Sequence, residues 1–160
     1  MTTIIAIDPG TRTAGVCVLA QEGSEWIPLY TGEIVRDTAD PMAMSREVLA
    51  AIAPWLGPEY RPVLAVIEDY RPRSGQSGAA ARVLEVIGVL RYVLSTEGCD
   101  VRLMQHTEWR ARWLDCVLGA IAGAGAGAGP QWMDDMGEHE LDAARMAWAV
   151  ATYPHSGIGG

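Results

Sequence analysis

Short apolar runs rich in β-branched residues open the chain. Residues 3–8 (TIIAID) and 14–20 (AGVCVLA) have the composition of strands, and the Pro-Gly pair between them is typical of a tight turn. Residues 26–35 (WIPLYTGEIV) predict a third strand, whose Pro28 restricts its start to a sheet edge or a bulge. Because short turns join these three strands, the pattern predicts an antiparallel meander.

The apolar period then alternates between helix and strand. Asp40 can cap a helix that starts at Pro41 and stops at a Gly-Pro pair. Residues 62–68 (PVLAVIE) form a continuous apolar run, which is typical of a strand buried on both faces. After a loop rich in Pro, Gly and Ser, apolar residues at helical spacing predict a long helix over 79–96.

The C-terminal third predicts one more strand and two helices. Residues 100–105 (DVRLMQ) read as a short strand, and Thr107 can cap the helix that follows. Residues 122–130 are a Gly-Ala run with too little side chain to pack, so we expect a flexible connector. Residues 138–153 predict a strong final helix with acidic residues in its first turn.

This order of elements predicts an α/β fold in one domain spanning residues 1–160. The leading strands pair antiparallel, whereas strand–helix–strand units need crossovers and therefore pair parallel. We expect a mixed five-stranded sheet, an antiparallel meander followed by parallel strands, with helices on both faces. This architecture matches the ribonuclease H-like fold, although a fold alone does not give a function.

Composition limits the classes of protein. The chain is 49% apolar and 20% charged, and it has no apolar run of the about 18–20 residues that a membrane span needs. No export leader precedes the first strand, and the three separated cysteines are typical of reduced thiols. We therefore expect a soluble, cytoplasmic protein with no membrane partner.

Charge is distributed unevenly. The net charge is −8, yet residues 71–112 hold seven arginines against four acids, and no lysine occurs anywhere. Arginine suits bidentate contact with phosphate, so this segment is a candidate nucleic-acid surface. An arginine-only codon bias on an ordinary solvated surface explains the pattern equally well.

Two carboxylates are expected to meet at one end of the sheet. Asp8 ends the first predicted strand and Glu68 ends the fourth, and these strands lie side by side and parallel in such a fold. Adjacent strands are about 5 Å apart, and like charges that close call for a proton or a cation between them. A hard divalent cation with oxygen ligands is the natural partner.

The last helix offers further ligands. His139 and Asp142 are three residues apart and share a helical face, while Glu138 could substitute because it lies four residues before Asp142. Glu140 points elsewhere and is expected to be solvated. Acids in a first turn also compensate the helix dipole, which is the simpler explanation for any one of them. The combination with two strand-end acids is what favours a metal centre.

These motifs together resemble the RuvC family of Holliday junction resolvases. "IIAIDPGTRTAGVCVL" resembles the family's opening strand and turn, "VLAVIEDYRPRSG" its second motif, and "HELDAARMAWAVATY" its closing helix. The resemblance implies an endonuclease, usually a homodimer, that cuts four-way or other branched DNA with two Mg²⁺ or Mn²⁺ ions.

The resemblance also implies residue roles. Asp8, Glu68 and Asp142 match the acidic ligands, with Asp8 between the two ions, and His139 matches the fourth ligand or a base. Tyr70 is a candidate for the aromatic that stacks at the junction, or else a loop aromatic packed on the sheet edge. The DNA-facing arginines would be Arg71, Arg73, Arg82, Arg110 and Arg112. The chain departs from the family in having no lysine and in its Gly-Ala run.

Other functions remain open at this stage. YqgF-like relatives of the same fold process RNA, but Glu68 and the His139–Asp142 helix favour the resolvases. A branched-DNA-binding module without strong catalysis is a further alternative. Sugar kinases and actin-like ATPases need two such domains, so we expect no nucleotide cofactor. The helix over 79–96 could supply a homodimer surface. A lysine-free chain with a simplified linker is what we expect of a phage-encoded enzyme, which would work in the bacterial or phage-infected host cytoplasm.

Overall fold

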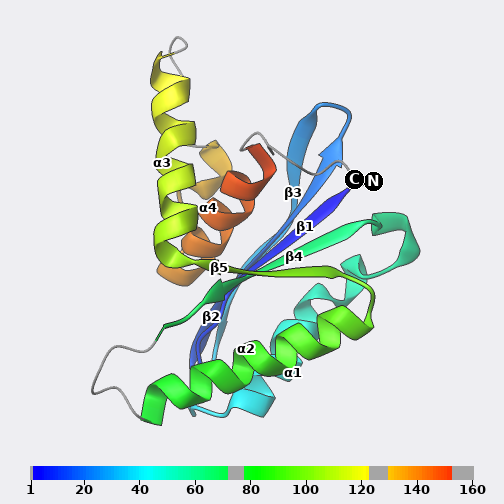
Figure 1. The fold of residues 1–160 in the computed structure, drawn as a ribbon, viewed down its shortest axis with the longest axis vertical. Helices are drawn as coiled ribbons and strands as arrows, with labels where there is room; N and C mark the ends of the chain where they lie inside the picture. Colours follow the sequence, from blue (N-terminus) through cyan, green and yellow to red (C-terminus); the bar gives the residue numbers. More distant parts are fainter. Residues whose placement is uncertain (1, 72–77, 123–129, 153–160) are drawn as a thin grey trace.

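A mixed five-stranded sheet forms the centre of the computed structural model, which describes residues 2–71, 78–122 and 130–152 (Figure 1). The strand order is β3-β2-β1-β4-β5, with β1, β2 and β3 antiparallel and with β4 parallel to both β1 and β5. The strands are β1 (Thr3–Asp8), β2 (Thr13–Glu22), β3 (Glu25–Val35), β4 (Val63–Asp69) and β5 (Asp100–Gln105). The predicted meander and the predicted parallel strands are confirmed.

Helices cover both faces of this sheet, as predicted. Figure 1 shows α1 and α2 on one face, with α3 and α4 on the other. The helices are α1 (Pro41–Ile52), α2 (Gly78–Thr96), α3 (His106–Ala122) and α4 (Glu138–Thr152), with short 3-10 turns η1 (Ala53–Trp55), η2 (Pro58–Tyr60) and η3 (Gln131–Met133). Within the ranges that the structure describes, no helix is long and apolar enough to cross a membrane.

Helix starts agree with the sequence in one case and differ in another. Asp40 caps α1 by accepting a hydrogen bond from the backbone N–H of Ala43 at 3.0 Å. The start of α3 lies at His106, so Thr107 is inside the helix rather than its cap. The predicted Gly-Ala connector overlaps α3 at Ala122, and its residues 123–129 lie outside the described part of the chain.

Side chains of β1 alternate between two separate apolar cores. Ile5 and Ile7 pack on the α1–α2 side, whereas Ile4 and Ala6 pack on the α3–α4 side. Asp8 therefore continues the α3–α4 side of the strand. Glu68 does the same on β4, because Val66 belongs to the α3–α4 core.

A glycine allows α4 to lie close against the sheet. Gly15 pairs with Asp8 in the β1–β2 register, and a Cβ added to Gly15 would collide with the backbone carbonyl of His139. No other residue type fits at this crossing. Gly15 therefore allows the first turn of α4 to lie against β2.

Candidate active site

Asp8 and His139 form the most direct contact at the sheet end. The imidazole Nδ1 of His139 donates to Oδ2 of Asp8 at 2.7 Å, since a carboxylate can only accept. This hydrogen bond raises the pKa of His139 above its ordinary value, against the smaller opposing effect of burial. In the neutral tautomer fixed this way, Nε2 carries the lone pair and remains available as a ligand.

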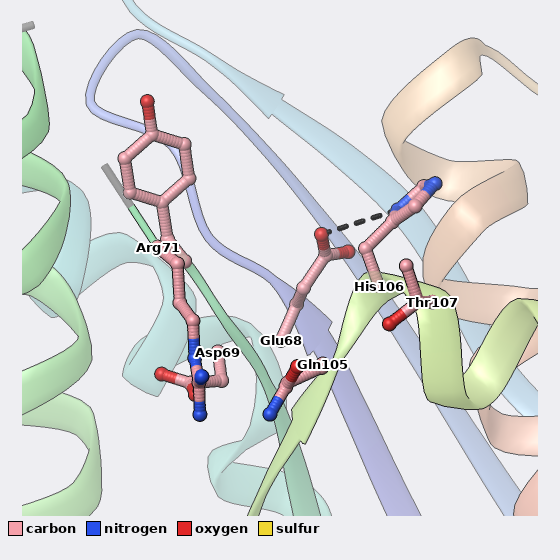
Figure 2. A pocket seen from close by; sticks show the side chains of 7 residues that line it. Glu68, Asp69, Arg71, Gln105, His106 and Thr107 are labelled. Atoms are coloured by element: carbon pink, nitrogen blue, oxygen red, sulfur yellow. Dashed lines mark hydrogen bonds and ion pairs between the residues drawn. The ribbon is translucent and has the colours of Figure 1, made fainter. Parts of the chain in front are cut away.

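Glu68 is held by two groups from the first turn of α3. Nδ1 of His106 lies 3.3 Å from Oε1 of Glu68, and Nε1 of Trp109 donates to Oε2 at 3.3 Å. His106 packs edge-on against Trp109, with ring centroids 4.9 Å apart. The two rings thus contact both oxygens of the Glu68 carboxylate. Figure 2 shows Glu68 and His106 pointing toward each other across the strand ends.

Asp142 completes a cluster of three carboxylates. Burial raises the pKa of Asp142, and the negative charge of Asp8 raises it further. Burial likewise raises the pKa of Glu68, with Asp8 the second cause. Because the charge of Asp8 adds to the effect of burial on both Glu68 and Asp142, the cluster favours a proton or a cation among its members.

The donor chemistry of this cluster fits a hard divalent cation. Asp8, Glu68 and Asp142 supply carboxylate oxygens, and His139 supplies an imidazole nitrogen, which suit Mg²⁺ or Mn²⁺. Among the residues that the structure covers, however, no three such side chains are oriented together as a ready set of ligands. Instead, Asp8 is paired with His139, Glu68 with His106 and Asp142 with Arg145.

The four predicted site residues are brought to one end of the sheet. Glu138, the predicted substitute ligand, is exposed at the first position of α4. Glu140 is partly buried, which differs from the solvated position expected for it.

The predicted DNA-facing residues are more dispersed. Tyr70 is half-buried and packs against the α1–α2 core, which agrees with the alternative of an aromatic at the sheet edge. Arg71 forms an ion pair with Asp69, and Arg112 forms one with Glu108 along α3. Arg82 and Arg110 are both exposed, on α2 and α3 respectively, and Arg73 lies outside the described residues.

Three residues near the site were not predicted from the sequence. His106 and Trp109 contact Glu68, and Arg145 lies 3.7 Å from Asp142 while covering the ring of Trp113. A signal for His106 existed, because it directly follows the strand that pairs with β4. For Trp109 and Arg145, the helical spacing alone did not tell which face points at the strand ends.

Comparison with solved structures identifies the fold. Thermus thermophilus RuvC in complex with a Holliday junction substrate has a TM-score of 0.64 and 17% identity, covering 93% of this chain and 92% of its own. The yeast mitochondrial Holliday junction resolvase Ydc2 has a TM-score of 0.59 and 16% identity, with 92% and 75% covered. The fowlpox virus resolvase with its junction DNA has a TM-score of 0.55 and 9% identity, with 92% and 97% covered.

The chain therefore has a fold of the α/β, ribonuclease H-like class. Within that class, it has the fold of RuvC and of other Holliday junction resolvases along most of its length. No protein-family model and no curated protein matches the sequence. The fold is thus established by structural similarity alone.

Proposed function

We propose that this protein is a divalent-metal-dependent endonuclease that cuts branched DNA. The observation that supports this most is the clustering of Asp8, Glu68 and Asp142, whose charges disfavour one another where a cation would relieve them. The cluster lies on a fold shared with proteins whose structures include bound Holliday junctions. Those junctions define the substrate class that we assign to this chain.

The residues divide the work as follows. Asp8, Glu68, Asp142 and His139 would hold two Mg²⁺ or Mn²⁺ ions, which supply an activated water and stabilise the leaving oxygen. The hydrogen bond from His139 to Asp8 fixes the imidazole, so that its second nitrogen stays in place. His106 and Trp109, both in the first turn of α3, orient Glu68.

DNA would be held by a small set of arginines around the site. Arg110 lies at the start of α3, with Nη1 3.4 Å from Nε2 of His106, and Arg71 follows β4 at the sheet end. Both are exposed beside the carboxylate cluster. Few cations and a net charge of −8 imply modest affinity with a shallow dependence on salt.

A homodimer is part of this proposal. The outer face of α2 exposes Leu84 (43%) and Tyr92 (71%) two turns apart, and a Cβ on Gly88 between them would meet open space. An apolar stripe with a small residue at its centre suits close packing against a second copy of the same helix. Leu84→Glu should convert a dimer to a monomer in sedimentation, while Arg91→Glu on the same helix serves as the charge control.

The test is cleavage of a labelled four-way junction with Mg²⁺ or Mn²⁺. We expect paired nicks that require the metal and that Asp8→Asn or Asp142→Asn reduces by at least about 10³-fold, with junction binding retained. Normal cutting by Asp8→Asn would refute the site. Cleavage of RNA without cleavage of branched DNA would replace the proposal with the YqgF-like alternative. Junction binding without any cleavage would leave only a DNA-binding module.

A further inference from the structure

A guanidinium lies beside the carboxylate cluster, on the helix that carries Asp142. Arg145 is the only arginine or lysine in the sequence after residue 112, a stretch that holds six acidic residues. Its Nη1 lies 3.7 Å from Oδ1 of Asp142, which is three residues earlier on α4. The cluster, which favours a cation, is thus given one by the chain itself.

The guanidinium of Arg145 is held by a ring from α3. Its Cζ lies over the ring of Trp113, 5.8 Å from the ring centroid, which is within the range of a cation–π contact. α3 packs alongside α4, and Trp113 lies one turn after Trp109, whose N–H donates to Glu68 (Figure 1). Of these two tryptophans, the first therefore contacts a carboxylate directly, and the second holds the cation beside another carboxylate.

The position of Arg145 is more constrained than that of an ordinary surface arginine. Its side chain is 37% exposed, and its Nε is buried with no hydrogen-bond partner in the described part of the chain. An exposed ion pair contributes little, because water screens it and both side chains lose freedom. Here the ring of Trp113 and the burial of Nε keep the guanidinium near Asp142, so its charge acts at a fixed place.

The contact between Arg145 and Asp142 acts through charge. Its length of 3.7 Å exceeds the range of about 2.7–3.2 Å for an N–H···O hydrogen bond, whereas charges interact over longer distances. The pKa of Asp142 reflects the same charges, because burial and Asp8 raise it while Arg145 lowers it. Lysine, which carries the same charge, should therefore replace Arg145 in this role, and an uncharged side chain should not.

A fixed positive charge has opposite effects on the protein with and without metal. Without metal, it offsets the repulsion between Asp142 and Asp8 and so stabilises the folded state. With Mg²⁺ or Mn²⁺ at the cluster, the same charge repels the ion and lowers its affinity. Because Asp142 is one of the four proposed ligands, both effects meet at this carboxylate.

We propose that Arg145 is a positioning residue that acts through Asp142 and sets the concentration of divalent metal that the site requires. This inference rests on the proposed metal-dependent function. The guanidinium balances Asp142 in the metal-free protein and is outcompeted when Mg²⁺ or Mn²⁺ is abundant. The chain thus limits the filling of its own site at low metal concentration.

The experiment measures Mn²⁺ binding to the protein without DNA, from the EPR signal of unbound Mn²⁺. Arg145→Gln should lower the dissociation constant about 3- to 10-fold, the size expected for removing one charge near a divalent ion. Arg145→Lys should keep the wild-type value. Arg46→Gln, which removes an exposed arginine from α1 on the other face of the sheet, is the matched control and should also keep it.

Thermal melting adds a readout that needs no bound metal. With a chelator present, Arg145→Gln should lower the melting temperature relative to wild type, and saturating Mn²⁺ should reduce this difference. If Arg145→Gln does not fold, Arg145→Met, which keeps an apolar stem beside Trp113, takes its place in both measurements.

Unchanged or weaker Mn²⁺ binding by the folded Arg145→Gln protein would overturn the inference while leaving the nuclease function intact. Arg145→Lys behaving as Arg145→Gln would also overturn it, because charge would then not be the cause. If wild type binds Mn²⁺ but cuts no branched DNA, the nuclease function fails, and tighter binding by Arg145→Gln still supports the role of Arg145. Absence of Mn²⁺ binding by wild type would reject both.

Discussion

The two faces of the sheet are built from different kinds of residue. The α1–α2 side is filled largely by Ile, Val and Leu, including Ile5, Ile67 and Leu90. The α3–α4 side is filled by Ala, Met and Trp, and five of the six tryptophans pack there. The α1–α2 core is largely aliphatic, and the α3–α4 core combines small residues with large aromatic rings.

This difference separates stability from chemistry. The strand alternation places Asp8 and Glu68 on the α3–α4 side, and His106, His139 and Asp142 come from its two helices. Gly15 on β2 allows the backbone of α4 to lie close to the sheet, and tryptophan supplies an N–H that an aliphatic core lacks. The α1–α2 side contributes mainly buried aliphatic side chains.

The largest effect is expected from the aliphatic side. Leu90→Ala removes a fully buried side chain and should lower the free energy of unfolding by about 2–5 kcal/mol. Cleavage per folded molecule should not change. Urea unfolding and junction cleavage at low temperature measure the two quantities. A loss of rate beyond the unfolded fraction would mean that the two faces are not separate.

The next effect concerns Gly15, where one substitution should change both stability and cleavage. Gly15→Ala should force α4 away from β2, cost about 1–3 kcal/mol and abolish cleavage, because its Cβ meets the carbonyl of His139. The pKa of His139, followed by NMR, should fall toward its ordinary value as the contact with Asp8 is lost. Gly78→Ala, where the added Cβ meets nothing, is the control and should leave both unchanged.

A smaller effect tests the hydrogen bond from Trp109 to Glu68. Trp109→Phe keeps the ring but removes the N–H donor, so the Mg²⁺ concentration for half-maximal cleavage should rise about 10-fold or more. Junction affinity should be unaffected. Trp132→Phe, which packs on Trp148 within the same core, should behave as wild type. Equal shifts in the two variants would indicate a general packing effect.

The smallest effect concerns stability without metal. Burial and Asp8 raise the pKa of Asp142 and of Glu68, so the folded state retains protons that the unfolded state has lost. Stability from these groups therefore falls as pH rises through the interval between the unfolded and the folded pKa. With a chelator present, Asp142→Asn should raise the melting temperature at pH 7 by a few degrees, about 2–4 °C per kcal/mol. Below that interval the difference should vanish in a melting series across pH.

Much of the fold could be predicted because its signals are local. Apolar runs, turn residues and the Asp40 cap gave the element order, and chain order with crossover rules gave the sheet. The convergence of Asp8 with Glu68 followed from the parallel pairing of adjacent strands. The His-x-x-Asp spacing placed His139 and Asp142 on one face of the last helix.

The rest depended on contacts between elements far apart in sequence. The role of His106 required the exact start of α3, which local capping signals placed two residues too late. Trp109 required the rotation of that helix about its axis, which 3.6-residue spacing leaves open between two partly apolar faces. The pairing of Asp8 and Glu68 with histidines, and of Asp142 with Arg145, required side-chain geometry as well.

The bond between Asp8 and His139 joins residues 131 positions apart. During synthesis, the ribosome produces Asp8 and Glu68 long before the helix that bears His139 and Asp142. A nascent chain that has emerged only as far as α3 therefore has two of the four proposed ligands and is expected to be inert toward DNA. If the proposed nuclease function holds, the order of the elements delays the assembly of the site until the last helix has been made.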